Sequence, residues 1–127
     1  MRTFFLIALG GAIGALLRFI VTELTTKLTG IAFPWGTILV NLAGCFVIGL
    51  LWGIFNDFEP GNNARLFVFT GILGAFTTFS SFALENFNLF RSGDIQLLTF
   101  NIAINNILGI ALVFAGFYLS SFLFIKR

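Results

Sequence analysis

Hydroxyl and amide side chains inside strongly apolar segments are the residues of this chain that could do chemistry. The densest group runs from Gly71 to Phe82, where two glycines are followed by four hydroxyl residues: Thr77, Thr78, Ser80 and Ser81. Phenylalanine recurs every third residue beside them, at Phe76, Phe79 and Phe82. In hydrocarbon an unsatisfied polar group costs several kcal/mol, and irregular backbone is tolerated only where it is buried in protein or lines a wet cavity. The stretch therefore indicates the working part of a membrane pore or transporter.

Two other apolar segments carry polar faces of their own. Asn41 follows Thr37 by one helical turn, and Asn101 and Asn105 lie one turn apart, with Asn106 beside them. At about 100° per residue, one polar face is also expected on the apolar run 64–90, which contains this stretch; it is made of Thr70, Thr77, Ser81, Glu85 and Asn88. Such faces serve either as interhelical hydrogen bonds, worth about 0.6 kcal/mol each, or as the lining of a solute path. For a single Ser or Thr we favour interhelical hydrogen bonding. For the three amides Asn41, Asn101 and Asn105 we favour the lining of a solute path.

The polar lining suits a small anion. Amide and hydroxyl groups donate hydrogen bonds, the edges of phenyl rings carry the positive part of the aromatic quadrupole, and Arg18 supplies positive potential. Glu85 opposes this interpretation unless it lies in a wide vestibule or pairs with an arginine. Ser and Thr also accept hydrogen bonds, so the residue types by themselves leave a cation path open.

Four long apolar runs must position these residues, at 3–28, 36–56, 64–90 and 95–125. Each reaches the ~20 residues that a helix needs to cross the hydrocarbon core. With 58% hydrophobic and only 9% charged residues among 127, the chain has too little polar surface for a soluble globule. We therefore expect a single all-α transmembrane domain of four helices, residues 1–127, with the third helix broken near its middle.

Enzymatic activity is not expected. The chain has no histidine, and its single cysteine, Cys45, lies in the middle of an apolar run, so neither the usual acid–base residue nor a metal-ligand cluster is present. We expect no nucleic-acid partner either, and the lipid bilayer is the expected environment.

Basic residues are nearly balanced between the two sides of the predicted bundle. With four spans, one side has Arg2, Arg65, Lys126 and Arg127, and the other has Lys27, Arg91 and Arg18. This weak bias allows either one fixed orientation or insertion both ways. Four helices that pack on one another leave no lumen, so we favour an antiparallel, dual-topology homodimer.

Four motifs occur in order along the chain: Gly10-Gly11-x-x-Gly14-x-x-x-Arg18, Gly36-Thr37-x-x-Val40-Asn41-x-x-Gly44, Thr70-Gly71-x-x-Gly74-x-x-Thr77-Thr78-Phe79-Ser80-x-Phe82-x-x-Glu85, and a fourth span rich in small residues from Gly109 to Gly116. In these motifs the chain resembles the CrcB/Fluc fluoride-channel family over essentially its whole length. The resemblance implies a passive fluoride channel in the bacterial inner membrane, an antiparallel dimer with two pores built from both subunits.

The resemblance also implies roles for individual residues. Asn41 would donate a hydrogen bond to fluoride, and Arg18 and Glu85 would lie near the pore mouth and in the vestibule. The expected pore phenylalanines and hydroxyl track are Phe79, Phe82, Thr78, Ser80 and Ser81. Backbone carbonyls of Gly74 and Thr77, exposed by the broken helix, would hold a structural Na⁺ on the two-fold axis, where an unwound turn frees its carbonyls.

The fourth span departs from the family pattern, because Asn101, Asn105 and Gly109 stand where hydroxyl or aromatic residues are common. We include Asn101 and Asn105 among the expected pore residues. Some members of the family are heterodimers of two diverged chains. Because Arg18, Asn41 and both phenylalanines are present in this one chain, we favour the homodimer.

Two other classes of protein fit four short spans. A proton-coupled small multidrug or guanidinium exporter needs a carboxylate near the middle of its first helix, whereas the only acid of this first span, Glu23, lies near its end. A non-transporting assembly subunit would use the polar faces only to join helices.

Overall fold

The computed structural model describes residues 1–30 and 33–124, and its elements are helices. The first two spans are the helices α1 (Arg2–Thr29) and α2 (Trp35–Phe58). The third consists of α3 (Asn62–Arg65), η1 (Leu66–Leu73), α4 (Gly74–Phe76) and α5 (Phe79–Ser92). The fourth consists of α6 (Ile95–Ala103), η2 (Ile104–Leu108) and α7 (Gly109–Phe124). Four helices are thus long and apolar enough to cross a membrane, with bounds within two residues of those predicted.

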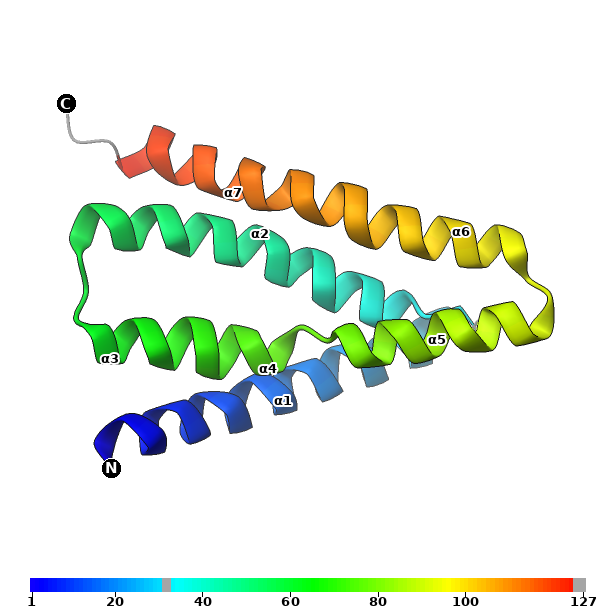
Figure 1. The fold of residues 1–127 in the computed structure, drawn as a ribbon, viewed down its shortest axis with the longest axis horizontal. Helices are drawn as coiled ribbons and strands as arrows, with labels where there is room; N and C mark the ends of the chain where they lie inside the picture. Colours follow the sequence, from blue (N-terminus) through cyan, green and yellow to red (C-terminus); the bar gives the residue numbers. More distant parts are fainter. Residues whose placement is uncertain (31–32, 125–127) are drawn as a thin grey trace.

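The four spans run alternately up and down the bundle (Figure 1). The second packs along the fourth, α2 against α7, while α1 packs against η1 and α4 of the third span. This order brings Arg2 and Arg65 to one end of the bundle and Lys27 and Arg91 to the other. The predicted positions of Lys126 and Arg127 lie outside the described residues.

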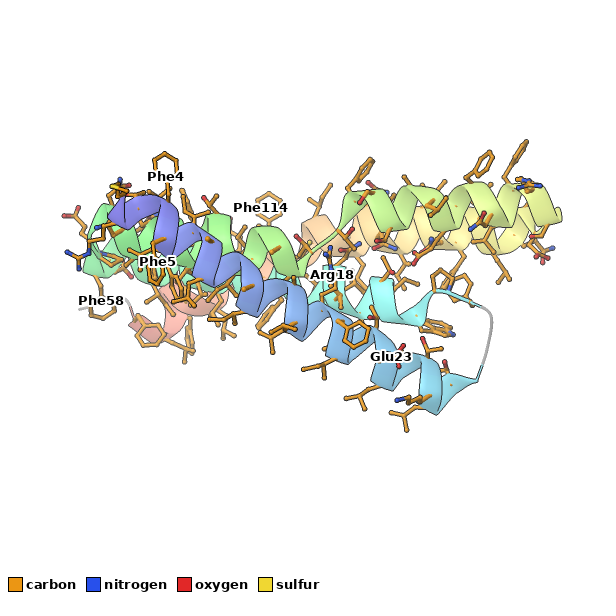
Figure 2. The ribbon with its side chains drawn as sticks, turned by 90° about the horizontal axis from the view of Figure 1, so that it is seen from below. Phe4, Phe5, Arg18, Glu23, Phe58 and Phe114 are labelled. Atoms are coloured by element: carbon orange, nitrogen blue, oxygen red, sulfur yellow. The ribbon has the colours of Figure 1, made fainter. Side chains whose placement is uncertain are left out.

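The outer surface of the bundle is apolar. Figure 2 shows Phe4 and Phe114 pointing away from it, and these side chains are 78% and 59% exposed. Exposed apolar side chains on all four spans would be costly in water, whereas lipid tails accommodate them. The chain is therefore a multi-pass membrane protein.

Glycines let the helices approach backbone to backbone. A Cβ atom added to Gly14 would collide with the carbonyl oxygen of Ile72 in η1, and a Cβ added to Gly10 would meet the third span as well. In the second span, a Cβ on Gly49 would collide with the carbonyl of Val113 in α7. Gly10, Gly14 and Gly49 therefore serve packing inside one chain.

The third span is interrupted at Thr77 and Thr78, as predicted for its middle. Both residues have extended backbone, with ψ of 156° and 120°. Gly74 itself remains helical, at φ −63° and ψ −32°. The two threonines therefore break the helix, and Gly74 does not.

The break divides the polar face that was expected on the third span. Thr70 is exposed, Thr77 lines one cavity, and Ser81 and Glu85 line another. The expectation assumed an unbroken register of 100° per residue. The wider π-helical turns of η1 and the extended pair Thr77–Thr78 both reset that register.

The packing at Gly14 gives a stability prediction. Gly14→Ala should lower the midpoint of thermal unfolding in detergent, because forcing one methyl group into a packed interface costs about 1–3 kcal/mol. Gly11→Ala is the matched control on the same helix, since an added Cβ there meets no atom within 4 Å. Equal midpoints for the two variants would contradict the described packing of α1 on η1.

Candidate functional site

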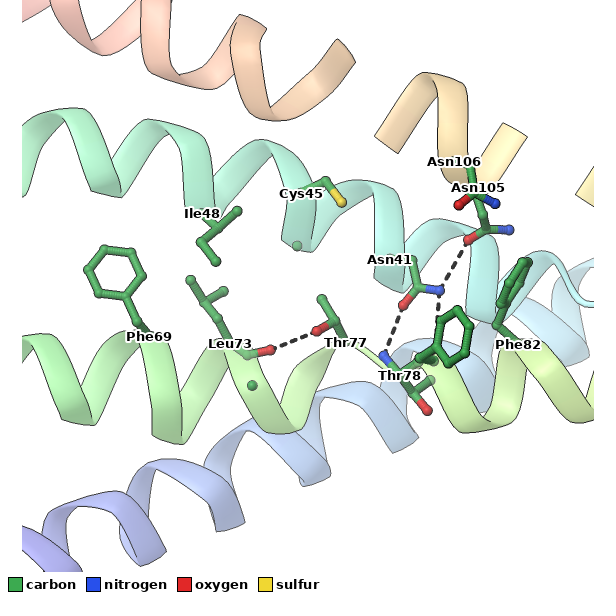
Figure 3. Close-up of a pocket in the computed structure, with 13 residues that line it drawn as sticks. Asn41, Cys45, Ile48, Phe69, Leu73, Thr77, Thr78, Phe82, Asn105 and Asn106 are labelled. Carbon is green, nitrogen blue, oxygen red and sulfur yellow. Dashed lines mark hydrogen bonds between the residues drawn. The ribbon is translucent and has the colours of Figure 1, made fainter. Parts of the chain in front are cut away.

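A cavity of about 310 Å³ lies beside the break and is lined by residues of the second, third and fourth spans (Figure 3). It brings together seven of the residues selected from the sequence: Asn41, Gly74, Thr77, Thr78, Phe79, Phe82 and Asn105. Asn106, which also lines it, donates to the carbonyl of Ile102 in its own helix at 2.7 Å.

Asn41 satisfies the backbone at the break. Its Oδ1 accepts the Thr78 N–H at 2.9 Å, and its Nδ2 donates to the Thr78 carbonyl at 3.3 Å (Figure 3). The same Nδ2 donates to Asn105 Oδ1 at 3.1 Å. Both hydrogens of the Asn41 amide are thus engaged, and the longer of the two bonds is the one to the Thr78 carbonyl.

The break also removes the helical partners of carbonyl groups in the turn before it, and Gly74 and Thr77 are among them. In a continuous α-helix the N–H of Thr78 would bond the carbonyl of Gly74, and the N–H of Ser81 would bond that of Thr77. Instead, Thr78 donates to Asn41 at 2.9 Å and Ser81 donates to Thr78 Oγ1 at 3.3 Å. The carbonyls that lose their α-helical donors at this end of the helix include the two selected from the sequence as cation ligands.

Three hydroxyl groups gather at the start of α5. Thr78 is buried, and its Oγ1 donates to Ser81 Oγ at 3.1 Å and lies 3.4 Å from Ser80 Oγ. Thr78 also lines the second cavity of the molecule. Thr78 therefore borders both cavities.

The two phenylalanines selected from the sequence contact each other. Their ring centroids are 5.6 Å apart, with the ring planes inclined at 51°. Phe82 is buried, whereas Phe79 is 77% exposed in the single chain. Phe79 thus leaves the cavity uncovered on one side.

The second cavity, of about 430 Å³, lies between α1, the start of α2 and α5 and is lined by both charged residues selected from the sequence, Arg18 and Glu85. Figure 2 shows Arg18 reaching from α1 towards the rest of the bundle. Thr37 donates to Glu85 Oε1 at 2.5 Å, while Glu85 Oε2 is buried with no hydrogen-bond partner among the described residues. Within residues 1–30 and 33–124 the ion pair found is Lys27 with Glu23, so Arg18 and Glu85 share this cavity without pairing.

Of the two amides selected on the fourth span, only Asn105 lines the cavity at the break. Asn101 is fully buried behind it, where it accepts from Asn105 Nδ2 at 2.9 Å and donates to Asn86 Oδ1 at 3.0 Å. Sequence reasoning missed Asn86, because it lies on another face of α5 than Glu85 and Asn88. The signal that could have found it is an amide inside an apolar span.

Comparison with known proteins gives one consistent result. Residues 5–117 match the model of one protein family, whose description is CrcB-like protein, Camphor Resistance (CrcB). A fluoride-specific ion channel FluC of Dehalococcoides mccartyi is 45% identical over 125 residues, 97% of this chain and 95% of the relative. A protein of the same name from Azobacteroides pseudotrichonymphae is 42% identical over 96% of this chain and 98% of the relative. Another from Agrobacterium fabrum is 45% identical over 94% of this chain and 96% of the relative. The chain belongs to the CrcB-like family.

Proposed function

We propose that this protein is a passive fluoride channel of the bacterial inner membrane. Relatives that are 42–45% identical over nearly the whole chain are named fluoride-specific ion channels, which also fits a protein that is not an enzyme. The structural observation that carries the proposal is the Asn41 amide of α2, which bonds the broken helix at Thr78 in an apolar cavity that Phe79 and Phe82 also line.

The donors at the site favour a small, strongly hydrated anion. Amide and hydroxyl hydrogens replace water around such an ion, and a narrow ring of them fits fluoride better than the larger chloride. Arg18 makes no ion pair with Glu85 within the described residues, so its charge acts on the second cavity, while one Glu85 oxygen is held by Thr37. The exporter alternative has less support, since Glu23 is exposed and lies 3.5 Å from Lys27 near the end of α1.

We further propose that two antiparallel copies form the channel, with one pore on each side of the two-fold axis. The near balance of Lys and Arg between the two ends supports insertion in both orientations. The exposed Phe79 ring and the open side of the cavity at the break provide a surface that a second copy would cover. Each pore would then be completed by residues of both subunits.

A structural Na⁺ completes this proposal. The carbonyls of Gly74 and Thr77 have lost their α-helical donors, and a hard cation takes oxygen ligands of this kind. Gly74 is exposed and lines the cavity, so its carbonyl belongs to the face proposed to meet the second copy. The ion would supply positive charge to carbonyls that no water reaches.

Asn41→Asp tests the proposed donor. The carboxylate keeps the acceptor for the Thr78 N–H but removes the amide donors and adds a negative charge, so fluoride efflux from liposomes, read with a fluoride electrode, should fall by orders of magnitude while the dimer still assembles. Asn56→Asp, at the exposed end of the same helix, should conduct normally. Wild-type protein that releases no fluoride would refute the proposed function, and an active Asn41→Asp would refute the role of Asn41.

Dual topology predicts how the chain inserts. Reporters fused to the C-terminus for each side of the membrane should give comparable signals. Two or three added lysines at one end should bias insertion and abolish transport, and an oppositely biased copy should restore it. One dominant orientation with full activity would rule out the antiparallel dimer.

Gly74 provides the test of the cation site. A Cβ at this position lies 3.4 Å from the carbonyl oxygen of Phe69, an ordinary contact, so the single chain accepts a Cβ atom there. Gly74→Val should nevertheless lose dimer stability and transport together, because its branched side chain crowds the symmetry-related copy. Thr77→Ser, which leaves the backbone ligand in place, should be tolerated. Replacing Na⁺ by a large organic cation should weaken the wild-type dimer, and insensitivity to Na⁺ would contradict the site.

A further inference from the structure

Four asparagines from three spans form one continuous chain of hydrogen bonds that runs in a single direction. It begins at a backbone N–H at the break and ends at a backbone carbonyl one turn into α5. Each member donates to the next at 2.9–3.1 Å, in the order Thr78 N–H, Asn41, Asn105, Asn101, Asn86 and the Phe82 carbonyl. We call these four residues the asparagine relay.

The two ends fix the orientation of every amide in the asparagine relay. The Thr78 N–H can only donate, and the Phe82 carbonyl can only accept. Turning any one amide over would place donor against donor on one side and acceptor against acceptor on the other. The backbone therefore assigns oxygen and nitrogen at all four side chains.

The asparagine relay is more than a local contact between two helices. It leaves the third span at Thr78, passes through α2 and the fourth span, returns to the third span at Asn86 and ends at the Phe82 carbonyl. The loop thus encloses residues 78–82, which carry the phenylalanines and hydroxyls of the candidate site. Asn101 is fully buried and Asn86 is buried, so these bonds lie in a medium of low dielectric, where hydrogen bonds in a chain polarise one another.

We propose that Asn86 and Asn101, which do not line the cavity at the break, are positioning residues for fluoride conduction. They act through Asn105, whose Oδ1 accepts a hydrogen bond from the Asn41 amide at 3.1 Å. On its other side, Asn41 Oδ1 accepts the Thr78 N–H. When the anion takes the hydrogen that Asn41 Nδ2 donates to the Thr78 carbonyl, these two bonds keep Asn41 Oδ1 turned towards the backbone. The inference rests on the proposed function.

Leucine substitutions in the asparagine relay separate positioning from packing. Asn86→Leu and Asn101→Leu should lower fluoride efflux about tenfold or more, because they leave buried amide groups unpaired and release Asn41. Asn88→Leu, two residues from Asn86 and exposed, is the matched control and should conduct as the wild type does. Dimer assembly, measured by size exclusion, should be retained.

Asn86→Asp and Asn86→Leu are expected to differ in fluoride efflux, and which of the two is faster distinguishes positioning from packing. A neutral carboxylic acid has one acceptor and one donor and can replace the Asn86 amide in the asparagine relay, whereas leucine is the better residue in an apolar bundle. Positioning therefore predicts more efflux from Asn86→Asp than from Asn86→Leu, and a role in packing alone predicts the reverse. If Asn101→Leu does not assemble, the comparison of Asn86→Asp with Asn86→Leu still distinguishes positioning from packing.

A second readout does not depend on transport. The NMR signals of the Asn41 side-chain amide and of the Thr78 N–H should shift in Asn101→Leu and in Asn86→Leu and stay unchanged in Asn88→Leu. Unchanged signals would overturn the asparagine relay, and efflux at the wild-type rate in both relay variants would overturn the positioning role of Asn86 and Asn101. If the wild type conducts no fluoride, the proposed function fails, and the NMR comparison still tests the relay.

Discussion

A helix broken at membrane depth must find partners for the backbone groups that it frees, and the rest of the site depends on how this chain does so. Thr77 and Thr78 adopt extended backbone in the middle of the third span. No water in hydrocarbon can satisfy their polar groups. The Asn41 amide takes the N–H and the carbonyl of Thr78, so a side chain of the second span completes the backbone of the third.

The two sides of the break then acquire different properties. Towards the preceding turn, the carbonyls of Gly74 and Thr77 lose their helical donors, which makes that side attractive to a cation. Towards α5, the hydroxyls of Thr78, Ser80 and Ser81 cluster beside the phenylalanine pair, which suits an anion. Thr78 is the residue that lines both cavities.

The sequence predicted those features that depend on composition and on local chemistry. Span bounds follow from hydropathy, and the broken third helix from its glycines and hydroxyls. The exact position of the break did not follow, because glycine at position 74 is compatible with a helix, and a tertiary partner, Asn41, stabilises the extended threonines instead. Asn86 was missed for a related reason: its importance comes from Asn101, fifteen residues away, and the periodicity of one helix cannot report such a contact.

The most direct measurement is an experimentally determined structure of the purified protein in lipid, at a resolution that shows side chains and with fluoride and Na⁺ present. The account predicts extended backbone at Thr77 and Thr78, with the Asn41 oxygen on the Thr78 N–H and the four asparagine amides linked in one direction. A continuous hydrogen-bonded helix through residues 74–79, with Asn41 turned to another partner, would contradict it.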